Sequence, residues 1–531
     1  MMTPTEISNL KKVKLENFWD EVDPKNISPE YPKNEIQDFF SGGSVFITGG
    51  TGFLGKLLIE KILRTCPDLS RIYILVRDKK GKDAKNRLKD MLNDVVFQRL
   101  KKESPLAQQK LEVVYGDVGK PDLGLSESDR KIIQDNATVI LHVAATVNFH
   151  EPLKNSVAIN VKGTLEMLKL AKNCEKLKSV VHVSTAFSFC PHKEIDEKFY
   201  NMPVKYDDLI QLTNTHDDQK LESMLPKILG EWPNTYAFTK AVAEDIVRKN
   251  ADSLPISIFR PGIVIATYKE PIRSWIDNVY GPTGVAMGAG TGVLHVFRCT
   301  SSEIIEMVPG DLVINGIIAC AYNTSTMNHT QRHPEDIKIY NYVSSIENPI
   351  THEEFMEKND RYGKQYPTIR ALWYHCLILT NNVPFYYLCT LFLHFIPALI
   401  FDGFALLTNN KPQLLRLYKK IHKFSGAIAY FACNSWVFHN NNTQALWKGL
   451  SHSAQVVYPF SMADMSWEKH SETHLLGLRT YLLKEDLDTL PKAIVKYRRL
   501  KLLHNTVKLL FWLFMIYCVY CVFTNILLFI F

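Results

Sequence analysis

A glycine-rich segment near residue 50 constrains the fold of this chain more than any other feature. Residues 44–48 form an apolar run typical of a buried strand, and Lys56 to Arg64 have the apolar spacing of a helix. Gly49 and Gly52 lie between these two segments, and Gly55 directly precedes the second. Such glycines allow a tight turn in which backbone N–H groups approach a pyrophosphate without obstruction by side chains. The segment therefore predicts a strand–turn–helix unit that binds a dinucleotide.

Further β-branched runs follow this unit at intervals long enough for a crossover helix between neighbours. We therefore expect the α/β fold class, with a doubly wound parallel sheet of the Rossmann type. After Gly262 the pattern becomes irregular and glycine-rich through Gly290, as expected of a substrate lobe above such a sheet. The expected strands are residues 44–48, 72–76, 112–115, 139–143, 179–183 and 256–260.

The length of 531 residues exceeds that of one ordinary domain. The first 40 residues are polar, contain several prolines and lack the apolar stretch of a signal peptide, so we expect the following domain to face the cytosol. The expected parts are an N-terminal arm at 1–40, a catalytic domain with its substrate lobe at 41–350, a helical C-terminal domain at 351–500 and a transmembrane helix at 509–531.

The last of these parts predicts membrane attachment. Residues 509–531 are 23 residues without a charged side chain, which is enough to cross the hydrocarbon core as a helix. Basic residues between Lys492 and Lys501 predict that the preceding chain stays in the cytosol, so we expect a single C-terminal anchor. The expected host is the peroxisomal or the endoplasmic reticulum membrane, with membrane lipid as a partner.

A second apolar segment, residues 383–401, has basic residues on both sides. A single crossing would leave one basic cluster on the wrong side of the membrane. We expect this segment to form a re-entrant or interfacial hairpin, or a buried wall of a lipid tunnel. Pro384 and Pro397 are expected to break its helix.

The net charge of +7 is modest for a chain of this length, and the basic residues gather beside the apolar segments. This distribution favours anionic lipid headgroups over nucleic acid, although ordinary solvated charge would give the same pattern. The ten cysteines show no regular framework, which suits a reducing compartment. We expect no nucleic acid and no metal, and the chain could form a homo-oligomer.

The end of the second expected strand indicates which dinucleotide is bound. Arg77 stands where a binder of NAD usually places an acidic residue, and a guanidinium suits the 2′-phosphate of NADPH. Arg87 adds positive charge, or is simply a solvated surface residue. The expected cofactor contacts are Thr48, Gly49, Gly50, Thr51, Gly52, Phe53, Leu54, Gly55, Arg77, Asp117, Val118, Ala144, Ala145, Tyr236, Lys240, Pro261, Gly262 and Val264.

Five residues are candidates for catalysis. Tyr236 and Lys240 are four residues apart and therefore share a helix face, where the ammonium is expected to lower the pKa of the phenol. Thr185 follows the fifth expected strand and can orient a carbonyl oxygen, with Ser184 as its competitor. Asn160 is expected to support Lys240 through water. Taken singly, Tyr236 and Lys240 would more often be surface residues, but their order after a phosphate loop favours a reductase.

Several longer motifs can be compared with known families: Phe39 through Ser44 to Gly55, Ile72 to Asp83, Asn234 to Glu244, Phe259 to Val264, Trp275 to Gly284, Tyr340 to Ser345 and Trp436 to Phe438. They resemble motifs of the extended short-chain dehydrogenases, and most closely those of the alcohol-forming fatty acyl-CoA reductases, including insect members. The resemblance implies reduction of a long-chain fatty acyl-CoA to a primary alcohol through an aldehyde, with two NADPH consumed and CoA released. It extends over about nine-tenths of the chain.

The chain departs from this family at two places. The family usually has arginine and an acidic residue where this chain has Asn148 and His150, and a second valine where it has Gly310. A lost arginine could weaken cofactor or CoA binding. Two other functions share parts of the pattern: a membrane-associated sterol or sugar-nucleotide dehydrogenase or epimerase, and a catalytically silent lipid-binding scaffold.

Overall fold

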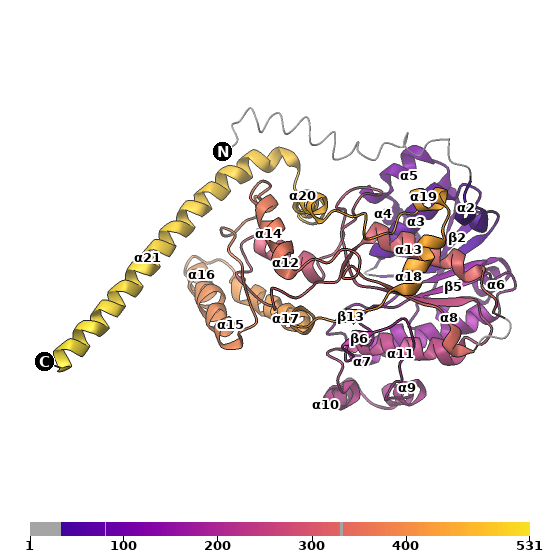
Figure 1. Ribbon diagram of the computed structural model, residues 1–531, viewed down its shortest axis with the longest axis horizontal. Coiled ribbons are helices and arrows are strands. Elements are labelled where there is room, and N and C mark those ends of the chain that lie inside the picture. The colour runs from indigo at the N-terminus through magenta and orange to yellow at the C-terminus, as the bar shows by residue number, and fades with distance from the viewer. Residues whose placement is uncertain (1–32, 80, 330–332, 531) are drawn as a thin grey trace.

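A computed structural model of the protein describes residues 33–79, 81–329 and 333–530. Its centre is a parallel sheet of seven strands in the order β11-β7-β5-β4-β1-β2-β3 (Figure 1). The expected doubly wound sheet is confirmed, and the seventh strand, β11, was not anticipated. The strands are β1 (Ser44–Thr48), β2 (Arg71–Val76), β3 (Leu111–Tyr115), β4 (Val139–His142), β5 (Ser179–Val183), β7 (Ile256–Pro261) and β11 (Ile339–Tyr342).

Helices cover both faces of the sheet. On one face lie α3 (Phe53–Thr65) and α13 (Gly310–Ser325), and on the other lie α8 (Gly163–Lys172) and α11 (Thr235–Asn250), above and below the sheet in Figure 1. Each face has its own apolar core, because the buried strands present β-branched side chains to both sides. The direction of winding reverses between β1 and β4, so a crevice for ligands is expected at the carboxyl ends of these two strands.

The remaining elements surround this frame. Most of the predicted arm, residues 1–32, lies outside the described residues, and its end forms α2 (Glu35–Phe40), which packs on α13. Among the described residues up to 350, the other α-helices are α4 (Ala84–Leu92), α5 (Gln98–Glu103), α6 (Glu127–Asn136), α7 (Leu153–Ser156), α9 (Tyr206–Thr215), α10 (Asp218–Leu229) and α12 (Gly281–Gly290). Short strands occur at β6 (Glu194–Ile195), β8 (Ile263–Ile265), β9 (Val296–Arg298), β10 (Met307–Pro309), β12 (Ile378–Thr380) and β13 (Val437–Phe438).

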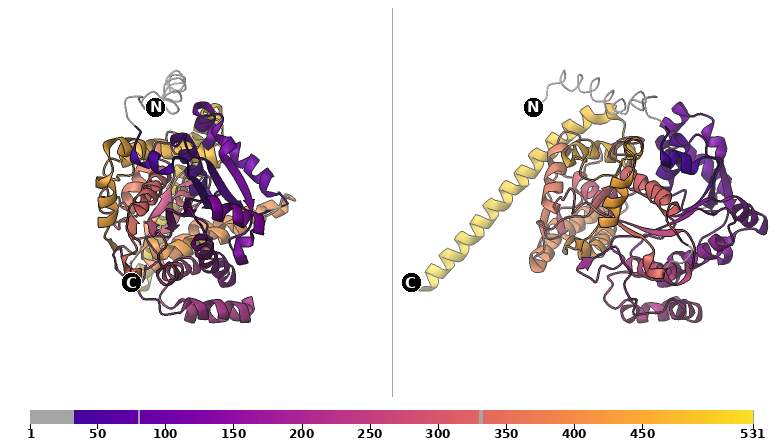
Figure 2. Two further views of the ribbon diagram at one scale, coloured as in Figure 1. Left: turned by 90° about the vertical axis from the view of Figure 1, so that its right-hand side faces the viewer. Right: turned by 45° about the vertical axis from the view of Figure 1, so that its right-hand side comes forward.

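The C-terminal region is mainly helical and packs partly into the core of the sheet. Tyr458 and Phe460 belong to the same apolar cluster as α3 and α13. The view turned by 45° shows these late segments beside the early ones (Figure 2). The helices are α14 (His352–Gly363), α15 (Val383–Thr390), α16 (Ile396–Leu407), α17 (Leu414–Ala432), α18 (Asn441–Gly449), α19 (His452–Val457), α20 (Trp467–Gly477) and α21 (Leu490–Ile530).

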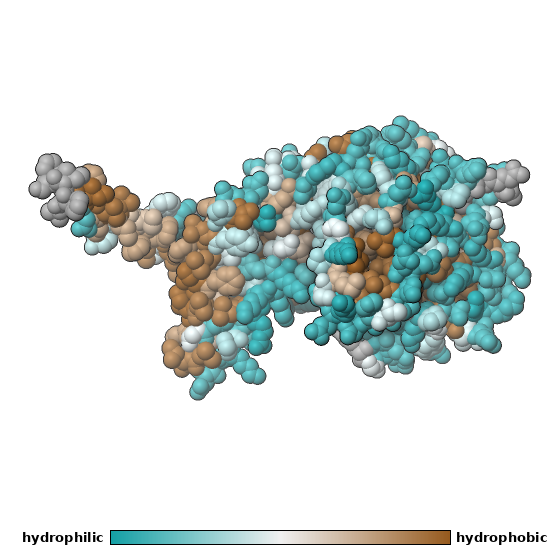
Figure 3. Space-filling view, turned by 90° about the horizontal axis from the view of Figure 1, so that it is seen from below, coloured by the Kyte–Doolittle hydropathy of each residue, from teal (hydrophilic) through white to brown (hydrophobic). Residues whose placement is uncertain are grey.

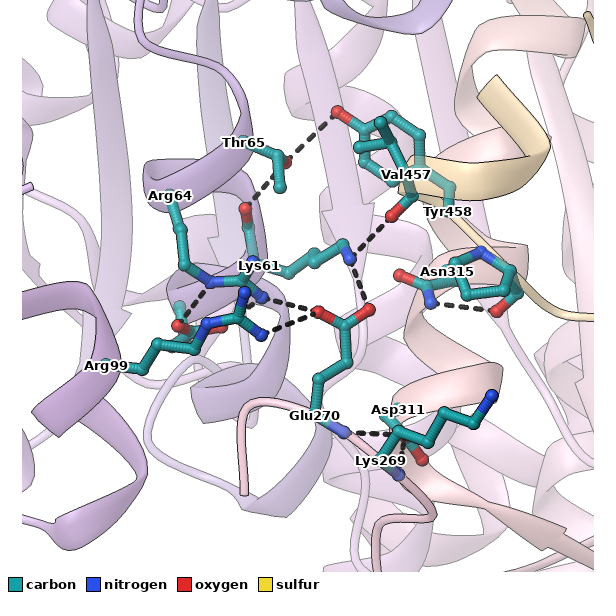
Figure 4. A network of polar contacts seen from close by, with 12 residues as sticks. Lys61, Arg64, Thr65, Arg99, Lys269, Glu270, Asp311, Asn315, Val457 and Tyr458 are labelled. Carbon is teal, nitrogen blue, oxygen red and sulfur yellow. Dashed lines mark hydrogen bonds and ion pairs between the residues drawn. The ribbon is translucent and has the colours of Figure 1, made fainter. Parts of the chain in front are cut away.

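A buried ion cluster fastens this region to α3 (Figure 4). The carboxylate of Glu270 lies 2.5 Å from the ammonium of Lys61 and 2.7 Å from the guanidinium of Arg64. Burial opposes ionisation of Glu270, but the surrounding cations outweigh it and hold its pKa well below the usual value. Lys61 also donates to the carbonyl oxygen of Val457 at 2.7 Å. The cluster therefore ties three distant parts of the chain together.

The segment from Val383 to Leu407 is one helical run of 25 residues, not the hairpin expected within 383–401. The expectation that two prolines break it is wrong. Pro384 lies in the first turn, where its missing N–H leaves no unmade bond, and Pro397 follows a π turn at Leu391–Phe395, which widens the helix beside the ring. The run does form a hairpin with α17, but the turn lies beyond residue 407.

This run is not a buried wall, because only 22% of its most apolar window is buried. The other apolar helix, α21, buries Ala493 and Tyr497 near its start but leaves its large apolar side chains from Leu502 to Ile526 exposed, and it contains residues 509–530 of the predicted anchor. Among the described residues, these are the two helices long and apolar enough to cross a membrane. Figure 3 shows their apolar surfaces at the same end of the molecule.

Candidate functional site

A cavity of about 1220 Å³ lies at the carboxyl ends of β1, β4, β5 and β7. It extends from the glycine-rich turn after β1 to α17. All the cofactor and catalytic residues expected from the sequence line this cavity, except Thr48, Gly50 and Asn160. The fold thus brings together residues that are more than 200 positions apart in the sequence.

The glycine-rich turn has the geometry of a phosphate cradle. Gly49 has a φ of +78°, and a Cβ there would lie 2.7 Å from the amide nitrogen of Ala144. A Cβ on Gly55 would lie 2.3 Å from the carbonyl oxygen of Gly49. The helix α3 begins at Phe53, earlier than expected, and its N-cap residue Gly52 has no side chain to cover the first N–H groups. These features fit a dinucleotide pyrophosphate at the helix N-terminus.

Two expected cofactor residues support the turn from behind. The hydroxyl of Thr48 is fully buried and bonds to Nδ1 of His142 at 2.8 Å and to the amide of Ala144 at 3.3 Å. Gly50 packs against the next strand, because a Cβ there would lie 3.0 Å from a methyl carbon of Ile74. Both residues therefore shape the turn and do not line the cavity.

Two guanidinium groups lie at the cofactor end of the cavity. Arg77 pairs with the carboxylate of Asp117 at 3.2 Å. Arg87, whose role was left open, donates to the hydroxyl of Thr51 at 3.0 Å and to the carbonyl oxygen of Arg77. Burial, and then the charge of Arg77, lower the pKa of Arg87. Positive charge is therefore concentrated beside the turn, on the side of β2.

At the centre of the cavity, the phenol of Tyr236 and the hydroxyl of Thr185 are hydrogen-bond partners. The ring of Phe149 stacks on Tyr236 with centroids 5.8 Å apart. Desolvation raises the pKa of Tyr236 to about 12, and the bond with Thr185 offsets this only in part. The expectation that Lys240 lowers this pKa is wrong. Tyr236 is therefore a protonated phenol at neutral pH and can donate its proton.

Lys240 lies one turn further along α11 and points its ammonium at the backbone. Its Nζ donates to the carbonyl oxygen of Val183 at 2.6 Å. Burial lowers the pKa of Lys240 to about 8, and the charge of Glu244 opposes this shift. The ammonium is thus held at the wall of the cavity, beside the end of β5.

The hydroxyls of Ser184 and Thr185, the two candidates for orienting a carbonyl oxygen, have different partners. Ser184 donates to a carboxylate oxygen of Glu244 at 2.5 Å, whereas Thr185 bonds to Tyr236. Of the two, Thr185 has its hydroxyl beside the phenol. Asn160, in a π-helical turn at Val157–Lys162, accepts from the amide of Thr146 at 3.0 Å and donates to the hydroxyl of Thr239 at 2.9 Å. It thereby holds α11 next to Lys240.

Sequence reasoning missed three buried residues behind the site. Glu244 and Arg260 form a fully buried ion pair at 2.5 Å. His142 bonds through its two nitrogens to Thr48 and Thr164, and burial, followed by the charge of Lys240, lowers its pKa to about 3. A charged residue within a strand of buried residues, as at Arg260, was a signal that a buried counter-ion exists elsewhere in the chain.

The far end of the cavity is apolar and is formed by α12, β9, α14 and α17. Phe431 of α17 contacts Phe149, with ring centroids 5.6 Å apart. At the rim, Asn148 donates to Glu151 at 3.0 Å and accepts from the amide of His150 at 3.1 Å. Asn148 and His150, the first of the two departures noted in the sequence, therefore lie at one edge of the cavity, whereas Gly310 does not line it. Its apolar lining includes Val285, Phe297, Met356, Phe424, Ile428 and Phe431.

Two family models, both described as "Male sterility protein", match residues 47–317 and 393–485, and the first is an NAD-binding model. The chain is 40% identical to "Fatty acyl-CoA reductase wat" of Drosophila melanogaster, over 92% of this chain and 93% of that protein. The chain belongs to the fatty acyl-CoA reductase family. As a family member with this dinucleotide fold, it is an oxidoreductase that uses a nicotinamide cofactor.

Other members of the fatty acyl-CoA reductase family are similar over comparable lengths. "Fatty acyl-CoA reductase 1" of Homo sapiens is 34% identical over 89% of this chain and 91% of its own. Among solved structures, the reductase domain of a non-ribosomal peptide synthetase from Mycobacterium tuberculosis superposes with a TM-score of 0.53 at 20% identity, covering 88% of this chain and 97% of that one. This last similarity concerns the fold alone.

Proposed function

We propose that this protein reduces long-chain fatty acyl-CoA to a primary alcohol and releases CoA, with an aldehyde as intermediate and NADPH as the cofactor. One observation carries the proposal. A single cavity contains a phosphate-binding turn, a hydrogen-bonded Thr185–Tyr236 pair and a long apolar wall. A nicotinamide cofactor and an acyl chain can therefore meet at a proton donor. The names of the similar proteins point to the same substrate.

The preference for NADPH rests on charge at the cofactor end. Gly49, Gly52 and Gly55 would hold the pyrophosphate, and Arg77 with Arg87 would hold the 2′-phosphate, for which a planar guanidinium is a good partner. Lys240 would hold the nicotinamide ribose. Each bound NADPH would supply one hydride to the acyl carbon, so the aldehyde and the alcohol would require two NADPH in succession, with NADP+ leaving between the two reductions.

The residues of the chain act on the oxygen of the substrate. The hydroxyls of Thr185 and Tyr236 would both donate to the carbonyl oxygen of the thioester and stabilise the negative charge that develops on it. When the tetrahedral adduct collapses, the carbonyl re-forms, the C–S bond breaks and CoA leaves as the thiolate. In the second reduction Tyr236 would give its proton to the alkoxide. A pKa of about 12 keeps that proton in place at neutral pH.

The apolar wall has a separate role in this scheme. An aldehyde released into water would be lost before its second reduction. Phe149 and Phe431 lie over Tyr236, and the cavity beyond them is lined by Val285, Phe297 and Met356. Such a wall would keep the acyl chain bound and exclude water between the two reductions.

The test is turnover of acyl-CoAs of 12 to 26 carbons by the detergent-solubilised protein with NADPH, and identification of products by mass spectrometry. Wild type should form alcohol with about two NADPH consumed per CoA released. Tyr236→Phe should reduce kcat by about 100-fold or more, since general acid catalysis contributes on this scale. Tyr115→Phe, a tyrosine exposed at the end of β3, is the matched control.

Other outcomes would change the proposal. Aldehyde as the sole product would retain the site and overturn the alcohol. Turnover of a sterol or a sugar nucleotide, with no acyl-CoA reduced, would instead support a membrane-associated sterol or sugar-nucleotide dehydrogenase or epimerase. Absence of NADPH consumption with every substrate would support a silent scaffold.

We also propose that the apolar part of α21 anchors the protein in a peroxisomal or endoplasmic reticulum membrane, with the catalytic domain in the cytosol. The exposure of Leu509 to Ile526 and the basic residues before them support this orientation. Leu513→Lys with Val519→Lys should release the protein from membranes washed with alkaline carbonate. A double variant that remains in the pellet would show that another segment, such as 383–407, holds the protein there.

A further inference from the structure

We propose that Lys420 and Lys423 of α17 bind the phosphate groups of the CoA portion of the substrate. The inference rests on the proposed function, because it names the part of the protein that recognises the non-reacting end of an acyl-CoA. The ligand chemistry is a phosphate ester on a flexible arm. It is separate from the phosphates of the cofactor, which would lie at the glycine turn.

The two faces of α17 differ in their surroundings. One face packs against the neighbouring helical run: Tyr418 is buried, and His422 bonds to His394 of the π turn at 3.1 Å. The other face borders the cavity. Its members recur every three or four residues, which places them on one side of the helix. They are Lys420, Lys423, Phe424, Ala427, Ile428 and Phe431.

The order of these residues along the helix matches an amphiphilic ligand. Phe431 is at the end near the reacting atoms, because it contacts Phe149, which stacks on Tyr236. The lysines are at the other end. At 1.5 Å per residue, Lys423 lies ~12 Å and Lys420 ~16 Å from Phe431 along the axis. The arm of CoA has about thirteen bonds between its sulfur and first phosphorus, or ~15 Å when extended at ~1.2 Å per bond.

The charge of both lysines is available for a ligand. Both side chains are exposed, and among the described residues no carboxylate pairs with either ammonium. His150 and Lys423 both line the cavity, and burial and then the charge of Lys423 lower the pKa of His150, so the ammonium lies near the rim that carries His150. Glu151, the carboxylate on that rim, already accepts from Asn148 and Asn155. A phosphate entering there meets two uncompensated cations.

The phosphate could come from another source, because α17 follows an apolar helix that is exposed at the membrane end of the molecule. Lipid headgroups carry the same chemistry as CoA. The cavity favours CoA, since both lysines line it on the same side as Phe424 and Phe431. Lys419, the residue before Lys420, does not line the cavity and is also exposed, so it serves as a matched control.

The experiment compares wild type, Lys420→Gln with Lys423→Gln, and Lys419→Gln in neutral detergent. In the double variant the KM for palmitoyl-CoA should rise by about tenfold or more, as expected for loss of charge-assisted contacts. Its kcat, its KM for NADPH and its KM for free hexadecanal should stay within about twofold of wild type, because none of these involves CoA. Lys419→Gln should match wild type in all four quantities.

Two further substrates make the test specific. The palmitoyl thioester of N-acetylcysteamine lacks the phosphates, so the double variant and wild type should use it equally well. Binding of free CoA, measured calorimetrically, should weaken by about tenfold in the double variant whether or not the protein turns over acyl-CoA. A protein that binds CoA through these lysines but reduces no acyl-CoA would refute the proposed function and leave this inference standing.

The opposite results would overturn it. A KM for palmitoyl-CoA and a CoA affinity within twofold of wild type would exclude the lysines from substrate binding. An equal loss with the phosphate-free thioester would indicate a distorted helix. Weaker binding to vesicles that contain phosphatidylserine, with an unchanged KM in detergent, would show that the lysines bind lipid instead.

Discussion

Replacing Lys240 by methionine should make the protein more stable at neutral pH while it destroys function. Methionine keeps the length of the apolar stem and removes the charge. The folded-state pKa of Lys240, about 8, lies below the ordinary value of 10.5, because burial disfavours the ammonium. At ~1.4 kcal/mol for each pH unit of difference, the buried charge costs ~3 kcal/mol. The bond to the carbonyl oxygen of Val183 is also lost, at ~1 kcal/mol. The net gain at pH 7 is therefore ~2 kcal/mol.

The pH dependence of this difference gives a sharper test than its size. Below about pH 8 both the folded and the unfolded chain hold the proton, and the destabilisation by Lys240 is present in full. Between about pH 8 and 10.5 only the unfolded chain holds it, so the free energy of unfolding of wild type rises with pH relative to the variant. The stabilising effect of Lys240→Met should therefore disappear across this window.

The measurement is the urea midpoint of each protein in neutral detergent at several pH values from 7 to 10.5, without cofactor. Activity with NADPH is followed in parallel, and kcat/KM should fall by about 100-fold, as expected for a lost charged donor to the cofactor. A variant less stable than wild type at pH 7 would refute the reasoning. So would a stability difference that stays constant from pH 7 to 10.

Three other substitutions test separate parts of the site. Gly55→Ala would place a Cβ 2.3 Å from the carbonyl oxygen of Gly49. NADPH affinity, measured by fluorescence titration, should therefore fall more than tenfold. The control is Gly290→Ala, whose Cβ meets open space and which should keep the wild-type affinity. Glu244→Gln leaves the guanidinium of Arg260 buried without its counter-ion, and thermal denaturation should show a loss of ~3–5 kcal/mol; an unchanged Tm would contradict the importance of this pair. Arg77→Ala should raise the KM for NADPH by about tenfold and leave that for NADH unchanged in steady-state assays, and equal effects on both would exclude a 2′-phosphate contact.

The sheet was predictable from the sequence because buried parallel strands are continuous β-branched runs between turns. Residues 44–48 and 179–183 were predicted with the bounds that the structure has. The strand β11 was missed because Asn341 interrupts its apolar character. That side chain is fully buried, and its amide donates to the carbonyl oxygens of Ile195 and His439, which come from other parts of the chain. No local pattern could reveal these partners.

The sequence correctly predicted that most of the candidate catalytic residues lie together, but it did not predict their electrostatics. The spacing of Tyr236 and Lys240 correctly indicates that they are neighbours on one helix, yet it says nothing about burial. Burial determines the direction of the pKa of Tyr236, which rises where a neighbouring ammonium was expected to lower it. Similarly, the choice between Ser184 and Thr185 depends on Glu244, which lies 60 residues from Ser184 in the sequence.

The surroundings of the apolar helical run at Val383–Leu407 were likewise not predictable from the sequence. Hydropathy alone could not distinguish a tunnel wall from a lipid-facing surface, since both are apolar. The run leaves Phe392, Ile400 and Phe404 exposed at the end of the molecule from which α21 extends, while α17 packs against its other side. A single helix, α17, thus separates this apolar surface from the cavity. Under the proposed function and anchoring, an acyl chain moving between membrane and active site would have a short route along α17, and its CoA end would then stay at the lysine-bearing rim.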